Sequence, residues 1–202
     1  MNVFIDISSD RIGIYGLDNP IFLDRNWVEI EIWKILVELD RKHGFNECII
    51  LNWPGWFTNL RVWTLSLNLL KTLKNDQIKF YSISKPELYS IFYKNGWIPR
   101  YWILYIWQKS NVWVRDTEKN ELIKMIKKSD INKIKDEYWE TYLDQVYDET
   151  YFWELENKLH YTYEDWNLIL TFNLQYTLDW KVLVNNEVEK LDANYMIAPN
   201  VS

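Results

Sequence analysis

Asp6, Ser8 and Ser9 follow the first apolar run of the chain, residues 3–5, and their side chains could do chemistry. An acidic residue at the carboxyl end of a buried strand lies where α/β sheets form ligand sites. With two hydroxyls beside it, it could hold a metal ion and phosphate groups. The same residues could instead form a turn in which side chains bond neighbouring backbone N–H groups. We favour the turn and interpret the segment as a degenerate phosphate loop.

No second motif completes a nucleotide or metal site. The 5 Gly in 202 residues form no cluster that would cradle phosphates. His43 and His160 belong to no H-E-x-x-H motif, and the single Cys48 has no paired cysteine, which argues against zinc. We therefore expect no catalytic residue, no metal and no cofactor of the chain's own.

Acidic residues are frequent in the second half, where two carboxylates could act as the acid and base of a glycosidase. A solvated helix face explains them better, because they are spread among Lys and Asn without a motif. They are Asp136, Glu137, Asp144, Asp148, Glu149, Glu154, Glu156, Glu164 and Asp165.

The composition, 48% hydrophobic and 26% charged residues, is that of a globular protein. A net charge of −6 argues against a protein that wraps nucleic acid by itself, and leaves open contact with nucleic acid through a basic partner. No apolar run is long enough to span a bilayer, and the N-terminus lacks a signal-peptide pattern. We therefore expect a cytoplasmic protein without a membrane segment.

The first half of the chain predicts an α/β fold. Strands are expected at 3–7, 11–17, 20–23, 48–51 and 78–83. Helices are expected at 28–42, 58–73 and 86–93. This order predicts a mixed five-stranded sheet with helices, of the actin-like ATPase (ribonuclease-H-like) type, with the first strand central. We place this lobe at 1–95 and a reduced, degenerate lobe at 96–202.

The pattern of the second half is weaker. A hairpin is expected from 102–107 and 112–115, and helices are expected at 120–128, 131–146 and 163–176. A hairpin or short strand is expected at 178–184 and a closing strand at 194–197.

Residues 52–63 join the fourth predicted strand to the second predicted helix and read NWPGWFTNLRVW. Pro54-Gly55 favours a tight turn, and Thr58 or Asn59 can cap the helix. A strand, a tight turn and a helix N-terminus in this order can hold an anion or a partner's backbone, and can equally be a plain connection.

This segment resembles the G-x-G-P-G-S-F-T-G-L-R-I-G signature of the TsaB (YeaZ) family, Gcp-like proteins of tRNA threonylcarbamoyladenosine synthesis. The residues that match are Pro54, Gly55, Phe57, Thr58, Leu60 and Arg61. The residues that differ are Trp53, Trp56, Asn59 and Trp63. The segments 4–9 and 194–202 are also similar to family segments, whereas the likeness between residue 90 and the last ten residues is weak.

The resemblance implies a non-catalytic accessory subunit. In that family two helices dock against TsaD as a helical bundle, and ATP and metal are held by the partner enzymes. We therefore expect a heterodimer with a TsaD-like protein, with a TsaE-like ATPase as a further candidate partner. tRNA would be contacted only through the complex. The absence of a paired-histidine metal motif fits TsaB rather than TsaD.

Each of the first two predicted helices has two apolar stripes, where an ordinary surface helix needs one. In 28–42 the stripes are Ile32, Ile35, Leu36 and Leu39, and Ile30, Trp33 and Val37. In 58–73 they are Leu60, Trp63, Leu67 and Leu70, and Val62, Leu65, Leu69 and Leu73. Either the other lobe or a partner protein covers the second stripes. With the resemblance, partner contact is expected at Ile30, Trp33, Val37, Leu60, Arg61, Trp63 and Leu67.

Two other functions stay open. The 13 Trp could form a stacking platform for a carbohydrate or a nucleobase, and the helix pair could join two copies in a homodimer.

The 13 Trp against 5 Gly raise a further hypothesis about the residues themselves. Trp53 and Trp63 stand where the family pattern has glycine, and Trp180 follows Asp179 where Asp-Gly would make a good hairpin turn. We hypothesise that several of these Trp correspond to UGA codons. The sequence gives UGA as Trp, whereas the host would insert Gly at this codon. The alternative is an AT-rich genome that has drifted away from glycine codons.

Overall fold

The computed structural model describes residues 2–9, 11–24, 28–52, 57–104, 111–130, 133, 137–138, 141–144, 159–164, 166–183 and 187–192. The chain forms two compact units. The first contains Met1–Lys85, Tyr163–Leu168 and Asp179–Ser202, and the second contains Pro86–Thr162 and Ile169–Leu178. The division into an N-terminal lobe, 1–95, and a degenerate C-terminal lobe, 96–202, stays a prediction.

The first unit contains a mixed six-stranded sheet with the order β13-β5-β4-β1-β2-β3. Its strands are β1 (Asn2–Asp6), β2 (Ile12–Tyr15), β3 (Ile21–Leu23), β4 (Glu47–Leu51), β5 (Lys79–Ile83) and β13 (Glu187–Val188). The helices that begin in this unit are α1 (Val28–His43), α2 (Phe57–Leu73) and α3 (Lys85–Lys94).

The central strand β1 pairs antiparallel with β2 and parallel with β4, and β4 pairs parallel with β5. Strands β1 and β4 are buried along nearly their whole length, as parallel strands covered on both faces must be, and this explains their continuous apolar sequences. The α/β prediction, including the central position of the first strand, is therefore confirmed. The sixth strand, β13, was not predicted, because two residues leave no pattern in a sequence.

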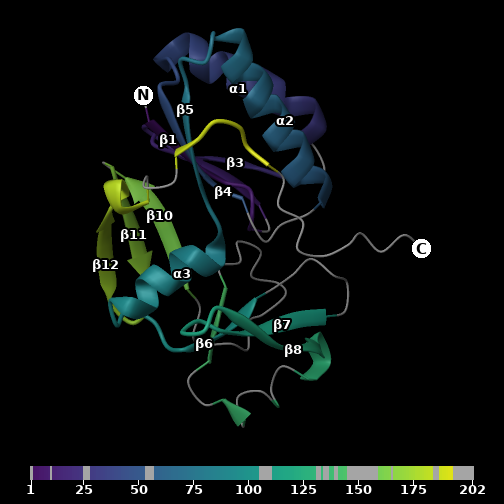
Figure 1. Ribbon diagram of the computed structural model, residues 1–202, viewed down its shortest axis with the longest axis vertical. Coiled ribbons are helices and arrows are strands. Elements are labelled where there is room, and N and C mark those ends of the chain that lie inside the picture. Colours follow the sequence, from purple (N-terminus) through teal and green to yellow (C-terminus); the bar gives the residue numbers. More distant parts are fainter. Residues whose placement is uncertain are drawn as a thin grey trace, which may run out of the picture. The chain divides into compact units, whose positions relative to one another are not determined.

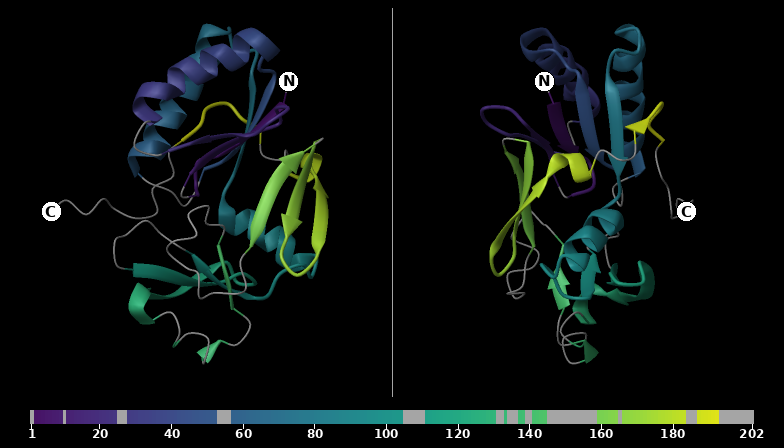
Figure 2. Two further views of the ribbon diagram at one scale, coloured as in Figure 1. Left: turned by 180° about the vertical axis from the view of Figure 1, so that it is seen from behind. Right: turned by 60° about the vertical axis from the view of Figure 1, so that its left-hand side comes forward.

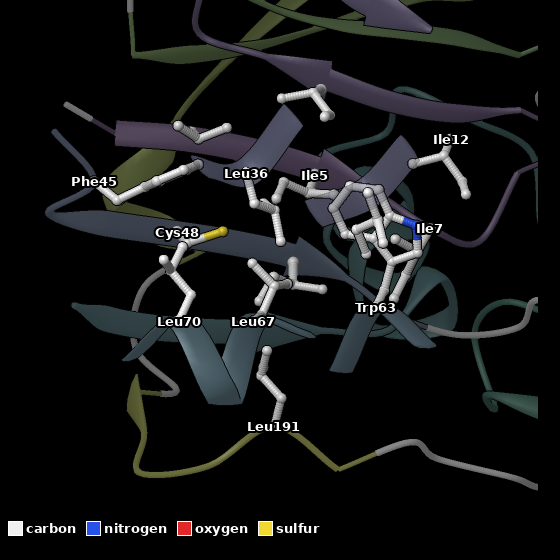
Figure 3. Packing of buried hydrophobic residues seen from close by; sticks show 14 of the residues in the cluster. Ile5, Ile7, Ile12, Leu36, Phe45, Cys48, Trp63, Leu67, Leu70 and Leu191 are labelled. Atoms are coloured by element: carbon white, nitrogen blue, oxygen red, sulfur yellow. The ribbon is translucent and has the colours of Figure 1, made fainter. Parts of the chain in front are cut away.

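Helices α1 and α2 lie side by side over one face of this sheet (Figures 1 and 2). The residues of β1 that face them, Val3 and Ile5, are fully buried, and so is Leu36 of α1. Figure 3 shows Leu67 and Leu70 of α2 pointing toward the same layer as Ile5 and Cys48. The inner stripe of each helix and the inner face of the sheet thus form one hydrophobic core.

Apart from β13, the described strands of the second half form two further sheets. The first is four-stranded, in the order β8-β7-β6-β9, and contains β6 (Tyr101–Leu104), β7 (Asn111–Asp116), β8 (Glu121–Lys127) and β9 (Thr141–Leu143). The other has the order β10-β11-β12 and contains β10 (His160–Glu164), β11 (Asn167–Thr171) and β12 (Gln175–Asp179). Short 3-10 helices occupy Lys128–Asp130 and Trp180–Val182.

Two helices predicted in the second half are wrong, and a third is wrong in part. Residues 121–127 form strand β8, paired with β7, because Asn120, at φ 55°, turns the chain back and cross-strand pairing outweighs a helix-like spacing of apolar residues. Residues 163–164, 167–171 and 175–176 belong to three strands instead of a helix. The predicted helix 131–146 contains strand β9, and most of its other residues lie outside the described ones.

The remaining predictions of the second half have mixed outcomes. The antiparallel pairing of β6 with β7 confirms the predicted hairpin, and its connection, 105–110, lies outside the described residues. The segment 178–184 begins with the end of β12 and continues as a 3-10 helix. The closing strand expected at 194–197 lies outside the described residues.

An ion pair ties the start of β6 to the end of β7 in the second unit. Arg100 donates to the Asp116 carboxylate through Nη2 at 2.6 Å and through Nε at 3.0 and 3.1 Å. The backbone N–H groups of Glu118 and Lys119 donate to the same carboxylate at 3.0 and 3.1 Å. Burial acts to raise the pKa of Asp116, but these donors outweigh it and hold the pKa below its ordinary value of 3.8.

Leu36→Ala tests the core of the first unit. Leu36 is fully buried between α1 and the sheet, so we expect its truncation to lower the free energy of unfolding by about 2–5 kcal/mol. Val37, the next residue, is 54% exposed, and Val37→Ala should change it by less than about 0.5 kcal/mol. Urea denaturation measures both, and equal effects would contradict the orientation of α1.

Asp116→Asn tests the ion pair through pH. Because the pKa of Asp116 is lower in the folded protein, its contribution to stability is present above about pH 4 and is lost as pH falls through the folded value. The variant should therefore lose less stability than the parent between about pH 5 and pH 2. Thermal denaturation across this range measures the slopes. Glu118→Gln removes the same charge from a half-exposed side chain and is the control.

Candidate functional site

The predicted phosphate-loop residues form a closed hydrogen-bond network at the carboxyl end of β1. Asp6 Oδ1 accepts from the Ser8 N–H at 2.8 Å, the Ser8 hydroxyl at 2.6 Å and the Ser9 N–H at 3.2 Å. Asp6 Oδ2 accepts from the Ser9 hydroxyl at 2.5 Å. These are the bonds of the local turn that the sequence analysis favoured. The carboxylate holds the chain after β1 in place.

Lys85, the first residue of α3, joins this network. Its Nζ donates to Ser9 Oγ at 3.0 Å, so Ser9 accepts from an ammonium and donates to the Asp6 carboxylate. All four side chains are buried, and Lys85 and Asp6 are at 0% exposure. A buried Lys was not predicted, because in a sequence it is one of 23 basic residues.

This geometry gives the network a structural role. In a Ser–Lys nucleophile pair the lysine must take the hydroxyl proton. Here the Ser9 hydroxyl donates to Asp6 and Lys85 is the donor to Ser9, which is the opposite polarity. Burial of all four side chains also leaves no surface at which a substrate could meet Ser9.

Neighbouring strand ends are tied together at the same edge of the sheet. The Ile7 N–H donates to the Leu51 carbonyl at 3.1 Å, and the Asn52 N–H donates to the Ile83 carbonyl at 3.1 Å. The Asn52 side chain donates to Ser82 Oγ at 2.6 Å. These bonds hold the ends of β1, β4 and β5 in register.

The family-motif loop is only partly described. Pro54 and Gly55 lie outside the described residues. Phe57 and Thr58 open α2, but their side chains are not described. Arg61, one turn further, is exposed.

Burial corrects the expected partner surface on α2. Leu60, Trp63 and Leu67 are at most 2% exposed and belong to the core, so a partner cannot reach them in this fold. The other stripe of α2 faces solvent instead, with Leu65 at 57% and Leu73 at 66% exposure. The sequence defined both stripes, but only the sheet decides which one is inward.

On α1 the division between the stripes is as expected. Ile32, Leu36 and Leu39 are buried, whereas Ile30 and Val37 are 60% and 54% exposed. Trp33 is intermediate, because it packs partly against the core. Side-chain burial in both helices thus leaves an outward apolar surface, which we call the outer face: Ile30 and Val37 of α1 with Leu65, Leu69 and Leu73 of α2.

The C-terminal part of the described chain packs along α2. Asn68 exchanges two hydrogen bonds of 2.9 Å with the backbone of Leu191, and Lys71 Nζ donates to the Glu189 carbonyl at 2.8 Å. Leu191 enters the same core as Leu67 (Figure 3). This segment therefore covers one flank of α2, while Leu65, Leu69 and Leu73 stay exposed.

One open cavity of about 270 Å³ lies beside the second half of α1. It is lined by Leu17, Asp18, Asn19, Ile21, Ile35, Glu38, Leu39, Lys42 and His43. Glu38 and Lys42 pair with each other across one helical turn at 2.5 Å. The volume is below the range of about 300–1,000 Å³ that is usual for ligand pockets, and we assign it no ligand.

Three of the carboxylates weighed as a glycosidase pair are described, and each has different surroundings. Glu137 pairs with Lys124, and buried Asp144 accepts from the Tyr89 hydroxyl. Glu164 is exposed. Asp136, Asp148, Glu149, Glu154, Glu156 and Asp165 lie outside the described residues.

Within the described ranges, no three His, Cys, Asp or Glu side chains come together as a metal site. His43 and His160 are both exposed. Cys48 is buried in the core, and desolvation raises the pKa of its thiol well above the usual range. Across the same ranges, no helix has the length and apolar character needed to cross a membrane.

Comparisons with known proteins gave only remote similarity. No family model matches the chain, and no curated protein matches it. Its structure is similar to that of YeaZ from Pseudomonas aeruginosa, at 12% identity and a TM-score of 0.40, over 62% of this chain and 64% of that one. It is also similar to an uncharacterized protein with similarity to peptidase YeaZ from the same organism, at 11% identity and a TM-score of 0.36, over 62% of each chain.

A third similar structure, from Bacteroides thetaiotaomicron, is described as having an actin-like ATPase fold and unknown function. It is 13% identical, with a TM-score of 0.33, over 73% of this chain and 83% of that one. This chain spans less than two thirds of the length of the first two proteins. We rest the fold assignment on the strand order and on the directions of the strands, not on these similarities.

Lys85→Met tests the buried network. The variant removes the ammonium that donates to Ser9 and keeps most of the apolar stem. We expect it to lower the free energy of unfolding by about 1.5–3 kcal/mol, the usual contribution of a hydrogen bond to a charged group. Lys79→Met, at an exposed position of β5, is the matched control and should change it by less than about 0.5 kcal/mol. If guanidinium denaturation gives equal values for the two variants, Lys85 does not support the turn.

Proposed function

We propose that this chain is a non-catalytic, TsaB-like accessory subunit that binds a TsaD-like protein through its outer face. In this role it supports formation of N6-threonylcarbamoyladenosine at position 37 of tRNA. ATP, metal and the transfer reaction belong to the partner enzymes, and the chain contributes a shaped surface. The observation that carries the proposal is the outward apolar stripe on both α1 and α2.

Two neighbouring helices that both expose apolar stripes favour a protein partner. A scattered apolar side chain on a surface is ordinary, but stripes on adjacent elements mark interaction sites. Ile30 and Val37 are two turns apart on α1, and Leu65, Leu69 and Leu73 follow each other one turn apart on α2. Such spacing suits a helical partner packing along the pair, as in a bundle.

The closed network at Asp6 supports a role without chemistry. Its carboxylate and both hydroxyls are used to hold the chain after β1. A nucleotide-binding relative would need these groups to face phosphate and metal. The use of these groups in a local turn therefore supports the proposal that nucleotide is held by a partner.

The alternative function, a stacking platform for a carbohydrate or a nucleobase, has little support among the described tryptophan side chains. Trp63 and Trp113 are buried, and Trp33 and Trp97 are partly buried. Only Trp166 among them is exposed, and one ring makes no platform. A homodimer would use the same outer face, so the experiment below distinguishes it from the heterodimer.

The test is co-purification with a TsaD-like protein from the same organism. We expect the parent chain to form a one-to-one complex in size-exclusion chromatography with light scattering. Val37→Asp combined with Leu69→Asp places two charges on the outer face and should weaken binding at least about a hundredfold, while circular dichroism stays unchanged. Trp33 is avoided because it also contacts the core.

Two controls define the outcome. Leu174→Asp changes an exposed leucine that is not on the outer face and should leave binding intact. Ile32→Asp with Leu36→Asp changes the buried stripe and should unfold the protein. Binding that survives the double change at Val37 and Leu69 would refute this interface. A dimer of the chain alone that the same change dissociates, with no complex formed, would favour self-association.

A further inference from the structure

Trp166 has a backbone conformation that tryptophan rarely adopts. Among the described residues, those outside glycine with positive φ are Asn75 at 51°, Asp76 at 59°, Asn120 at 55° and Trp166 at 69°. Asn and Asp tolerate this left-handed region because their short polar side chains bond locally, whereas a bulky residue there is strained. Gly16, Gly44 and Gly96 also have positive φ. Trp166 is thus the exception in a set made otherwise of Gly, Asn and Asp.

The surroundings of position 166 are those of a two-residue hairpin turn. Strand β10 ends at Glu164, β11 begins at Asn167, and the two strands are neighbours in one sheet. The connection is therefore Asp165-Trp166. Two-residue hairpin turns of the commonest type need positive φ and strongly prefer Asn-Gly or Asp-Gly. In the sequence, Asp165-Trp166 thus has Asp followed by Trp where Asp-Gly would be preferred.

Burial does not explain the tryptophan either. Its side chain is 49% exposed, so no close packing compels a large residue there. Trp97, by comparison, is only partly exposed, and its ring stacks on Tyr176 with centroids 5.0 Å apart and planes at 13°.

A second tryptophan, Trp63, stands out for a different reason. Trp63 is fully buried in α2, and its indole Nε1 has no hydrogen-bond partner among the described residues. A buried tryptophan N–H usually finds an acceptor. The dipeptide Asp-Trp occurs again at Asp179-Trp180, where Asp179 Oδ1 accepts the Lys181 N–H at 2.9 Å, the bond of an Asx turn.

We propose that position 166 is glycine in the protein that the organism makes. Codon 166 would be UGA, which the sequence gives as Trp and which the organism's ribosomes translate as glycine. Positions 63 and 180 are further candidates. Composition agrees, because average glycine use of about 7% would give roughly 14 Gly in this length and the chain has 5, against 13 Trp. The proposal concerns residue identity and is independent of the proposed partner.

The proposal is tested by sequencing codon 166 in the gene and by mass spectrometry of the native protein. Trypsin cleaves after Lys158 and Lys181, so one peptide, 159–181, contains both position 166 and position 180. We expect codon 166 to be UGA, and we expect the peptide from the organism's own cells to show glycine at 166 by mass spectrometry. A UGG codon, or tryptophan at 166 in that peptide, would overturn the proposal.

Purified variants test the physical reason. Trp166→Gly should lower the unfolding equilibrium constant of the full chain by about fivefold, because it removes a strained side chain from a positive-φ position. Trp166→Asn should give a smaller gain, because Asn tolerates that region. Trp97→Gly is the matched control and should raise the constant, because it removes a stacked ring. A loss of stability in Trp166→Gly would refute the strain argument.

Discussion

The structure of the first unit depends on burial of the inner face of its sheet beneath two helices. Val3, Ile5 and Ile7 on one side and Leu36 and Leu67 on the other are nearly or fully shielded from water, and removal of apolar area from water is the dominant favourable term in folding. This contact decides the rotation of both helices. It makes Trp63 a core residue and turns Leu65, Leu69 and Leu73 outward. The proposed binding surface therefore follows from the core.

The same constraint acts on the polar side chains at the edge of the sheet. Asp6 and Lys85 are charged groups at 0% exposure, and a buried charge is tolerated only when it is hydrogen-bonded or paired. Ser8 and Ser9 supply those bonds, and no part of the network is left facing solvent. An aspartate that could hold phosphate thus fixes a turn, and the outer face becomes the feature most suited to function.

Prediction from sequence succeeded where local pattern and final burial agree. Continuous apolar runs at β1 and β4, a glycine after α1 and regular spacing in α2 each indicated the element that forms. Secondary structure was predicted wrongly where pairing with another strand, or a turn without the usual turn residues, determined the backbone conformation. Strand β8 has helix-like apolar spacing, and only pairing with β7 makes it extended. The helix expected at 163–176 was wrong because the chain turns at Trp166, which has a positive φ. Tryptophan does not indicate a turn in a sequence, whereas glycine at this position would have done so.

The sequence alone determined the α/β order of the first half, the two apolar stripes of each helix, and the residues Asp6, Ser8 and Ser9 of the turn. These features are local, because they depend on spacing within one segment or on hydrogen bonds between near neighbours. Tertiary structure decided which stripe is buried, that Lys85 meets Ser9 from 76 residues away, and that β13 joins the sheet beside β5. Those outcomes depend on contacts between segments far apart in the chain, and residue spacing within one segment does not encode them.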